Sequence, residues 1–476
     1  MKYNQAFDSK KKSSNRDLLF AKYNSLGLKL LEKNNLNDAL KNFVKAIEYR
    51  DDKPETLTNI GLIFHLKNKL PEAEFMYRKS LYFDNTKAEN YYNLGIILSQ
   101  QNKNKEAIEA YEKSLELNPN NPNTLKFLGN LYKDSKLFHK ALKIYKKWSV
   151  VIPNNAESDF NQSLIHIRNG RLDLGWKMYE AGLKNNIREL FEGYKLETSL
   201  PWDGEPFDGN LLVYGEQGIG DQIMFGTLLP ELIDVQKRII IQVDQRLVNL
   251  FKRTFPEIQV FGDKSSIDTS LYKEFISMGS LCKLFRNSTS DFLKNRTHVF
   301  SDNKTLTKTI KKKMPHAKLL KIGFSWHSFA TRTSLERSLT EENVSKIISS
   351  NNHTFINLQY GNVQHSLEKI NTLGKGKIYT IPSIDLTQDL DSVLSIIKNC
   401  DLIITIDNSL AHLSSCLGKP TWILLPYSAN FRWFEKIVPA LWYNNTSLIR
   451  QSHENSWDNV VNNISEALNN TIASVK

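Results

Sequence analysis

The sequence predicts an α plus α/β fold, in which an α-helical repeat array precedes a unit with two parallel β-sheets. Two observations carry this prediction. Residues of fixed type recur every 34 positions through the first third of the chain, and short β-branched runs alternate with amphipathic segments from about residue 205. A chain of 476 residues exceeds one hydrophobic core, and its 40% hydrophobic content is typical of folded, soluble domains.

Four columns of residues define the repeat, and each column holds one steric type except at Trp148. Stacked helical hairpins produce such spacing, because two antiparallel helices approach closely at glycine and alanine while an aromatic ring fills the seam. Pro119 and Pro153 mark the ends of second helices, since proline cannot continue a helix. The columns are Gly27, Gly61, Gly95 and Gly129; Ala39, Ala73, Ala107 and Ala141; Phe43, Tyr77, Tyr111 and Tyr145; and Ala46, Ser80, Ser114 and Trp148.

This pattern resembles the tetratricopeptide repeat across about residues 20–153. A fifth, degenerate unit follows and is expected to cap the stack. We therefore place the array at residues 20–190, after a polar tail at residues 1–19. The residues of the fifth unit that keep register are Ser163, Gly175, Tyr179 and Gly182.

The expected activity of the array is binding, because stacked hairpins form a concave groove lined by their first helices. Asn59 and Asn93 share one position on that face, where they would hold a peptide backbone. The alternative is that both reflect the frequent asparagine of the whole chain.

The net charge of +12 favours polyanionic partners: nucleic acid, an anionic membrane surface or phosphorylated substrates. No RNA-binding motif is found, so we do not expect a nucleic-acid partner, and peripheral membrane contact stays open. Part of the excess lies in lysines between residues 304 and 321, which we interpret as a solvated helix and connector.

A cytoplasmic location is expected. No run approaches the roughly 18 apolar residues of a membrane span, and the polar first residues lack the apolar centre of a signal peptide. Cys282, Cys400 and Cys416 are too few and too scattered for a disulfide framework or a zinc cluster.

The second half is predicted to form two Rossmann-like lobes at residues 200–312 and 318–476. Helices are expected to start near Asp221, Gln245, Thr340, Leu386 and Ser409, and a last amphipathic segment covers about residues 457–473. The expected strands are Leu211–Tyr214, Ile239–Val243, Ile258–Phe261, Lys321–Trp326, Phe355–Tyr360, Lys377–Ile381, Leu402–Ile406 and Thr421–Leu425.

Polar residues gather after four of these strands, where open parallel sheets bind their ligands. Glycines 215, 218 and 220 let the backbone turn and expose amide groups at a helix N-terminus, which stabilises negative charge. Asp221 is expected at the N-cap of this helix, a role worth about 1 kcal/mol, and the same residue can also take part in chemistry. The other three positions are His327 with Ser328, Gln359, and Asp407 to His412.

Nicotinamide-dinucleotide binding is a competing interpretation, because Asp244 ends the strand after the glycine-rich turn. The glycine order here is G-x-x-G-x-G, however, whereas the dinucleotide fingerprint requires G-x-G-x-x-G.

Several segments are similar to the glycosyltransferase domain of bacterial tetratricopeptide-repeat proteins, a relative of the ADP-heptose lipopolysaccharide heptosyltransferases (glycosyltransferase family 9-like). The segments are GEQGIGDQIMFGTLLPEL, KIGFSWHS, FINLQYG, DLIITIDNSLAHLSSCLGKPTWILLPY and FRWF. The resemblance covers about residues 200–450 and implies a GT-B fold. The lobe at 200–312 would then face the acceptor and the lobe at 318–476 the nucleotide sugar. The architecture also resembles protein O-linked N-acetylglucosamine transferases.

The resemblance implies a role for individual residues. Asp221, in the matching Gly-Asp pair, would be the catalytic base, and Arg337 would face the donor phosphate. His412 is either a donor ligand or a buried structural residue, and Arg432 either contacts the ligand or pairs with a carboxylate. The implied donor-binding residues are Gln217, Gly218, Gly220, Trp326, His327, Arg337, Ser338, Gln359, Asp407, Asn408, Ser409 and His412, of which Trp326 also suits a core position and Gln359 is a weak candidate.

The resulting prediction is a hexosyl or heptosyl transferase that is independent of metal, inverts the sugar carbon and moves a sugar from a nucleotide sugar to a protein or glycan recruited by the repeats. No cofactor or metal site is expected. Two alternatives stay open: a non-catalytic adaptor that binds protein partners, and a dinucleotide-dependent oxidoreductase. Residues 195–476 alone are expected to keep donor binding.

Overall fold

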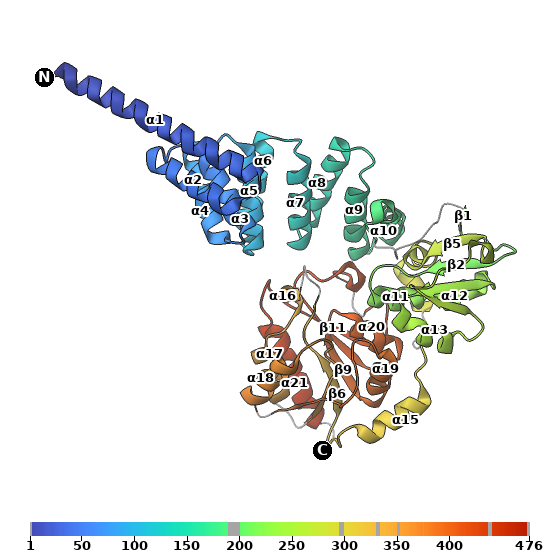
Figure 1. Cartoon of the computed structure of the whole chain (residues 1–476). Helices are drawn as coiled ribbons and strands as arrows, with labels where there is room; N and C mark the ends of the chain where they lie inside the picture. The colour runs from blue at the N-terminus through green and yellow to red at the C-terminus, as the bar shows by residue number, and fades with distance from the viewer. Residues whose placement is uncertain are drawn as a thin grey trace. The chain divides into compact units, whose positions relative to one another are not determined.

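The computed structural model divides into two compact units, Met1–Ser158 and Asp159–Lys476 (Figure 1). The residues that it describes are 2–188, 200–294, 299–329, 334–349, 353–374, 376–436 and 440–473.

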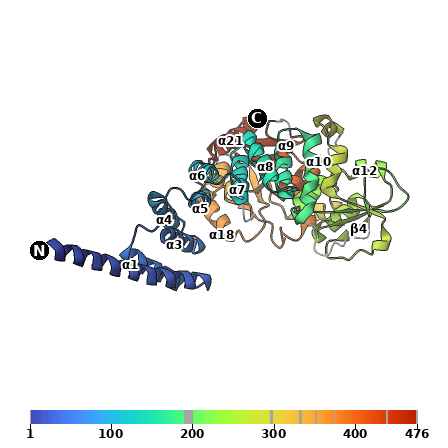
Figure 2. The same ribbon diagram turned by 90° about the horizontal axis from the view of Figure 1, so that it is seen from above.

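The first unit is a series of helical hairpins, in which α3 lies beside α4 and α5 beside α6 (Figure 2). The segment expected as a polar tail is helical, because α1 begins at Lys2. The helices are α1 (Lys2–Glu32), α2 (Leu36–Tyr49), α3 (Pro54–Leu66), α4 (Leu70–Phe83), α5 (Ala88–Gln100), α6 (Asn104–Leu117), α7 (Pro122–Asp134) and α8 (Phe138–Val151).

The glycine column exists because each glycine lies against the aromatic ring of its own hairpin. A Cβ atom added at Gly95 would lie 2.6 Å from the Tyr111 ring, and one added at Gly129 would lie 2.6 Å from the Tyr145 ring. Both distances are shorter than carbon atoms tolerate, so the seam accepts the ring only where the facing helix has no side chain.

A fifth column, which the sequence patterns above do not include, forms the turn within each hairpin. Its residues have left-handed backbone dihedrals, and the amide after each bonds back into the first helix, as from Lys69 N to Phe64 O at 2.8 Å. Asparagine tolerates this conformation better than most residues do. The column is Asn34, Asn68, Asn102, Lys136 and Gly170, with φ between 56° and 79°.

The second unit begins with helices that the sequence places in the repeat array. Its first elements are α9 (Ala156–Arg168), α10 (Leu172–Tyr179) and the 3-10 helix η1 (Glu180–Asn186). Gly170, at the turn between α9 and α10, belongs to the column of left-handed residues, so this hairpin keeps the repeat geometry. Its contacts nevertheless group residues from Asp159 onward with the α/β part.

Two parallel sheets form the rest of the second unit. The order in the first sheet is β1-β5-β2-β3-β4, and that in the second is β11-β10-β9-β6-β7-β8. Strands β2, β3, β9 and β10 have the predicted bounds, whereas β1, β5 and β11 are short or polar and were not predicted. The strands are β1 (Leu200–Pro201), β2 (Leu211–Tyr214), β3 (Ile239–Val243), β4 (Gln259–Gly262), β5 (Glu274–Ser277), β6 (Lys321–Ser325), β7 (Thr354–Asn357), β8 (Ile378–Tyr379), β9 (Leu402–Ile406), β10 (Thr421–Leu425) and β11 (Thr446–Arg450).

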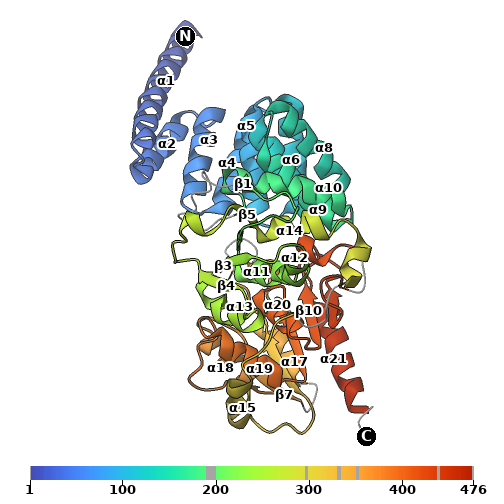
Figure 3. The same cartoon turned by 90° about the vertical axis from the view of Figure 1, so that its right-hand side faces the viewer.

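Helices pack against both sheets, and the C-terminal α21 contacts α17 (Figure 3). The lysine-rich segment forms α15, whose lysines are exposed while Ile310 is buried. The helices are α11 (Ile219–Gly226), α12 (Leu229–Val235), η3 (Gln245–Leu247), α13 (Val248–Thr254), η4 (Thr269–Leu271), η5 (Met278–Ser280), α14 (Leu281–Phe285), η6 (Thr289–Lys294), α15 (Lys304–Lys313), α16 (Ser334–Arg337), α17 (Glu341–Ser349), α18 (Gln364–Leu373), α19 (Leu390–Asn399), α20 (Ser409–Cys416), η7 (Phe431–Trp433) and α21 (Asp458–Ala473).

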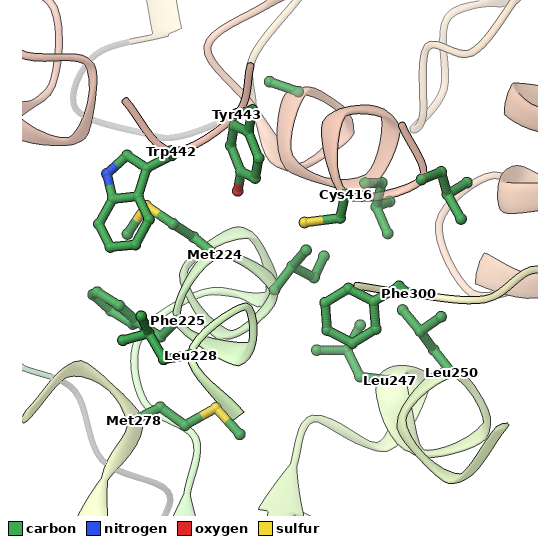
Figure 4. Packing of buried hydrophobic residues seen from close by; sticks show 14 of the residues in the cluster. Met224, Phe225, Leu228, Leu247, Leu250, Met278, Phe300, Cys416, Trp442 and Tyr443 are labelled. Carbon is green, nitrogen blue, oxygen red and sulfur yellow. The ribbon is translucent and has the colours of Figure 1, made fainter. Parts of the chain in front are cut away.

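One hydrophobic core joins the first sheet, part of the second sheet and the hairpin of α9 and α10. Met224 and Phe225 of α11 lie opposite Trp442, Tyr443 and Cys416 of the second sheet's side (Figure 4). A separate core lies under α17 and α21. The shared core fixes the loops that follow β2 and β9 close to each other.

A test of the repeat seam is Gly129→Ala. Alanine is the better helix former, but its methyl group would meet the buried Tyr145 ring, so we expect a loss of about 1–3 kcal/mol in the free energy of unfolding. Thermal unfolding followed by helical circular dichroism measures this. The control is Glu109→Ala on the exposed side of α6, which we expect to stay within about 0.5 kcal/mol of wild type. An equally stable Gly129→Ala protein would contradict the steric explanation.

Candidate functional site

The glycine-rich loop after β2 delivers Asp221 to the site. Gly218 occupies the N-cap position of α11, so Asp221 is the third residue of that helix rather than its cap. The capping role that the sequence left open for Asp221 is therefore wrong. Its carboxylate instead forms an ion pair with the guanidinium of Arg432, a residue that is 8% exposed. This pairing is the carboxylate role that the sequence offered as one alternative for Arg432.

The glycines of this loop have different roles from those expected. The left-handed residue is Gln217, with φ of 56°, and not a glycine. Gly215 is required for space, since a Cβ atom there would lie 2.7 Å from Gln222, whereas one at Gly218 would meet only the Asp221 carboxylate at 3.8 Å. The loop is therefore strained at a residue that has a side chain.

Side chains from the hairpin of α9 and α10 and from the residues after it hold the loop. The Gln217 amide Nε2 donates to the Tyr179 hydroxyl at 2.6 Å. Arg188 Nε donates to Glu216 Oε1 at 2.9 Å, and neither of these two side chains is exposed. Burial raises the pKa of Glu216 although Arg188 opposes this effect. The side chains of Tyr179, Arg188 and Glu216 are all buried.

The loop after β9 meets the glycine-rich loop at Gly220. A Cβ atom at Gly220 would lie 3.1 Å from His412 Cδ2 and 3.4 Å from Ser409 Cα, so the N-termini of α11 and α20 come together there. Asn408 is the N-cap of α20: its Oδ1 accepts from Leu410 N at 3.0 Å, and its Nδ2 donates to Ser325 Oγ at 3.0 Å. Two helix N-termini at one point favour negative charge in the space beside them.

Asp407 is a buried carboxylate in which one of the two oxygens lacks a hydrogen-bond partner among the described residues. Trp433 Nε1 donates to its Oδ1 at 2.7 Å, while its Oδ2 has no hydrogen-bond partner among the described residues and lies 3.8 Å from Arg337 Nη1. Burial alone would raise the pKa of Asp407, but the charges of Arg337 and Arg432 hold this pKa below its ordinary value. The site therefore contains two ion pairs, Asp221 with Arg432 and Asp407 with Arg337, and the charge of Arg432 also acts on Asp407.

His412 is buried beside this cluster. Its Nδ1 lies 2.8 Å from the Tyr443 hydroxyl, and its ring stacks on Trp433 with 5.1 Å between centroids. Burial, with a further contribution from Arg432, lowers the pKa of His412 from 6.5 to about 3. His412 is thus a neutral hydrogen-bonding group at physiological pH.

The remaining predicted donor residues lie after β6 and β7. Gln359 is buried, and its Oε1 accepts from the amides of Trp326 at 2.9 Å and His327 at 2.7 Å, so it orders the loop after β6. Trp326 is 2% exposed and stacks on Phe324, which is the core position that the sequence also allowed. Ser338 Oγ accepts from the amide of Ser328 at 3.0 Å.

Sequence reasoning missed the hydrogen bonds that hold the backbone just after Arg432. Phe434 is left-handed, with φ of 50°, and the Arg450 guanidinium donates to the carbonyls of Trp433 and Phe434. The FRWF segment marked the place, but the strain and Arg450 cannot be read from it.

Asp244, on which the dinucleotide interpretation depended, caps η3 and pairs with Arg246 at 2.7 Å.

The groove candidates lie in the first unit. Asn59 on α3 and Asn93 on α5 are both half-buried and occupy equivalent positions in successive hairpins. The described ranges contain no group of three or more His, Cys, Asp or Glu side chains that could hold a metal ion. In the same ranges, no helix combines the length and apolar character needed to cross a membrane.

The comparisons with known proteins place the repeats. A family model described as the tetratricopeptide repeat matches residues 88–121, the hairpin of α5 and α6. Protein FlbA of Caulobacter vibrioides is 22% identical over 340 residues, which are 67% of this chain and 56% of FlbA. The matched region thus spans little more than half the length of this curated relative.

Some solved structures are also similar to part of this chain. MamA is 22% identical in a match that covers 36% of this chain and 93% of MamA, with a TM-score of 0.34. YrrB, described as a TPR protein with an unusual peptide-binding site, is 20% identical over 34% of this chain and 83% of YrrB, with a TM-score of 0.32. The first half of the chain contains tetratricopeptide repeats, and a parallel-sheet α/β region follows them.

The buried neutral His412 predicts a pH-dependent stability. Between the folded pKa of about 3 and the ordinary 6.5, the unfolded chain binds a proton that the folded chain does not, so stability falls as the pH is lowered through this window. Going from pH 7.5 to pH 5 should cost about 2 kcal/mol through this residue.

Urea unfolding followed by tryptophan fluorescence at the two pH values measures this loss. His412→Gln keeps a hydrogen-bonding side chain and should reduce the pH-dependent loss by that amount, while His453→Gln at an exposed position should not. An equal loss in wild type and His412→Gln would contradict the burial of a neutral imidazole.

Proposed function

We propose that the α/β part of this chain is a glycosyltransferase of the GT-B type, which moves a sugar from a nucleotide sugar to a protein or glycan acceptor. The observation that carries the proposal is the cluster of Asp221, Arg432, Asp407 and Arg337 beside the N-termini of α11 and α20. It combines a candidate base with a site for a diphosphate, and two parallel sheets flank it as the GT-B type requires. The resemblance of residues 200–450 to family 9-like glycosyltransferases supports the same conclusion.

The donor diphosphate is the natural ligand of this cluster. Backbone amides at helix N-termini and guanidinium groups are the donors that bind phosphate oxygens most strongly in proteins. Arg337 is 20% exposed in its side chain and lies at the edge of the cluster, so it is within reach of an incoming ligand. These groups would carry the negative charge of the departing nucleoside diphosphate without a metal ion.

The acceptor hydroxyl needs a base, and Asp221 is the candidate. In the structure without a ligand, the Asp221 carboxylate is occupied by its ion pair with Arg432. A diphosphate that competes for Arg432 would release Asp221, so the base becomes available once the donor is bound. Asp221 then takes the hydroxyl proton while the acceptor oxygen bonds the sugar carbon and the bond from that carbon to phosphate breaks. Inversion at the sugar carbon follows from the family resemblance.

The repeats of the first unit are proposed to recruit the acceptor or another protein partner. Tetratricopeptide repeats stack into a surface that binds extended peptides, and Asn59 and Asn93 lie at equivalent positions of α3 and α5. We also propose a cytoplasmic location for the protein, as the sequence led us to expect. An adaptor without catalysis is the outcome that the next experiment separates from this proposal.

The base is tested by Asp221→Asn. Asparagine keeps the size of the side chain but does not accept the proton, so turnover should fall by about two to four orders of magnitude. Binding of UDP, GDP or ADP, measured by thermal shift, should be kept or strengthened because Arg432 loses its competing carboxylate. The control is Asp234→Asn at an exposed position of α12. Normal turnover in Asp221→Asn would remove the base, and no transfer by wild type with any nucleotide sugar would favour the adaptor.

The diphosphate site is tested by Arg337→Ala. Removing one guanidinium should weaken binding of the nucleoside diphosphate by a few kcal/mol at most, as measured by isothermal titration calorimetry. Lys346→Ala, an exposed cation on α17, is the matched control and should leave the affinity unchanged. A chelator should change the transfer rate little. Strict dependence of transfer on a divalent metal would contradict the mechanism.

A further inference from the structure

We infer that residues 159–188, called here the positioning segment, hold the candidate site in its working geometry, with Tyr179 as the positioning residue. The inference rests on the proposed function for its catalytic consequence. The segment comprises most of α9, all of α10 and η1, and it belongs to the second unit.

The first contact of the segment is with the glycine-rich loop. Gln217 has φ of 56°, a conformation that residues with a side chain adopt rarely, and its amide donates to the Tyr179 hydroxyl at 2.6 Å. Tyr179 is fully buried, so this bond is made away from water. The hydroxyl therefore holds the loop in a strained conformation four residues before Asp221.

The second contact is the pair of Arg188 and Glu216. Arg188 makes two hydrogen bonds to this carboxylate, donates to Ser277 Oγ at 2.5 Å and lies 4.4 Å from the Tyr179 ring centroid. Arg188 and Glu216 are both completely buried, so Glu216 depends on Arg188 to balance its charge, while Arg188 also pairs with Glu180 at 3.2 Å. The residue next to Gln217 is thus fixed by the same segment.

The third contact is with the second sheet's side of the site. Arg168 Nε donates to Glu435 Oε2 at 2.9 Å, and the Glu435 amide donates to the Arg168 carbonyl at 2.9 Å. The Phe431 ring lies 5.8 Å from the Tyr179 ring. Phe431 and Glu435 flank Arg432, the partner of Asp221, in the sequence. The segment therefore contacts the chain near Arg432 as well as the loop before Asp221.

Tyr179 occupies the aromatic column of the repeats, which connects this role with the sequence. In the hairpin of α7 and α8 the same column holds Tyr145, whose hydroxyl donates to Asn130 at 2.7 Å within the hairpin. The last hairpin directs its hydroxyl to the glycine-rich loop instead. A chain of residues 195–476 would lack Tyr179, Arg188 and Arg168, so under this inference it would lose part of its donor binding, contrary to the expectation from the sequence.

Tyr179→Phe tests the inference, because it removes the hydroxyl and keeps the ring. We expect kcat for sugar transfer to fall about 10- to 100-fold with the melting temperature little changed. We also expect faster hydrogen exchange of the backbone amides in residues 215–222. Tyr145→Phe is the matched control, since it removes a hydroxyl from the same repeat column in the first unit. It should change neither kcat nor the hydrogen exchange of residues 215–222.

A second variant separates positioning from general destabilisation. Glycine adopts positive φ without strain, so Gln217→Gly in the Tyr179→Phe background should restore slow exchange and raise kcat again. Wild-type kcat in Tyr179→Phe, or a lower melting temperature without rescue by Gln217→Gly, would overturn the inference. If wild type transfers no sugar, the proposed function fails, and the exchange of residues 215–222 alone decides whether Tyr179 holds the loop.

Discussion

The ion pair between Asp221 and Arg432 is the interaction on which the candidate site depends. It joins the loop after β2 with the segment after β10, and the side chains of Arg432 and Asp221 are 9% and 14% exposed. Burying charges is costly unless partners and hydrogen bonds replace the lost hydration. Asp407 and Arg337 extend the pair into a cluster whose charges cancel. The charges of the four side chains are therefore balanced without a ligand.

Backbone strain surrounds this ion pair on both sides. Gln217 precedes Asp221, and Phe434 follows Arg432, and both have left-handed backbone dihedrals although neither is glycine. Such residues persist only where the surroundings fix them, and they occur preferentially at functional sites. Tyr179 and Arg450 supply the fixing hydrogen bonds here. The positions of the two charged groups are thus set by pairs of strained and restraining residues.

The repeat pattern has two different uses along the chain. In the first unit, glycine and aromatic columns close the seam of each hairpin and leave a surface for partners. In the last hairpin the aromatic residue, Tyr179, packs against Trp176 and Phe431 within the core of the α/β part. The last hairpin of the repeat pattern is therefore shared with the core of the α/β part. This sharing offers a physical route by which the last repeat affects the site.

The sequence alone determined the hairpins and most strands. The 34-residue spacing and the β-branched runs are both patterns that can be recognised without knowing which distant residues come into contact. The sequence also placed Asp221 and Asp407 after the carboxyl ends of their strands, where open parallel sheets bind their ligands. Only the tertiary structure decided that Asp221 pairs with Arg432, 211 residues away, and that Gln217 takes the left-handed conformation. Contacts between distant loops follow no period, and they form only when the shared core brings those loops together.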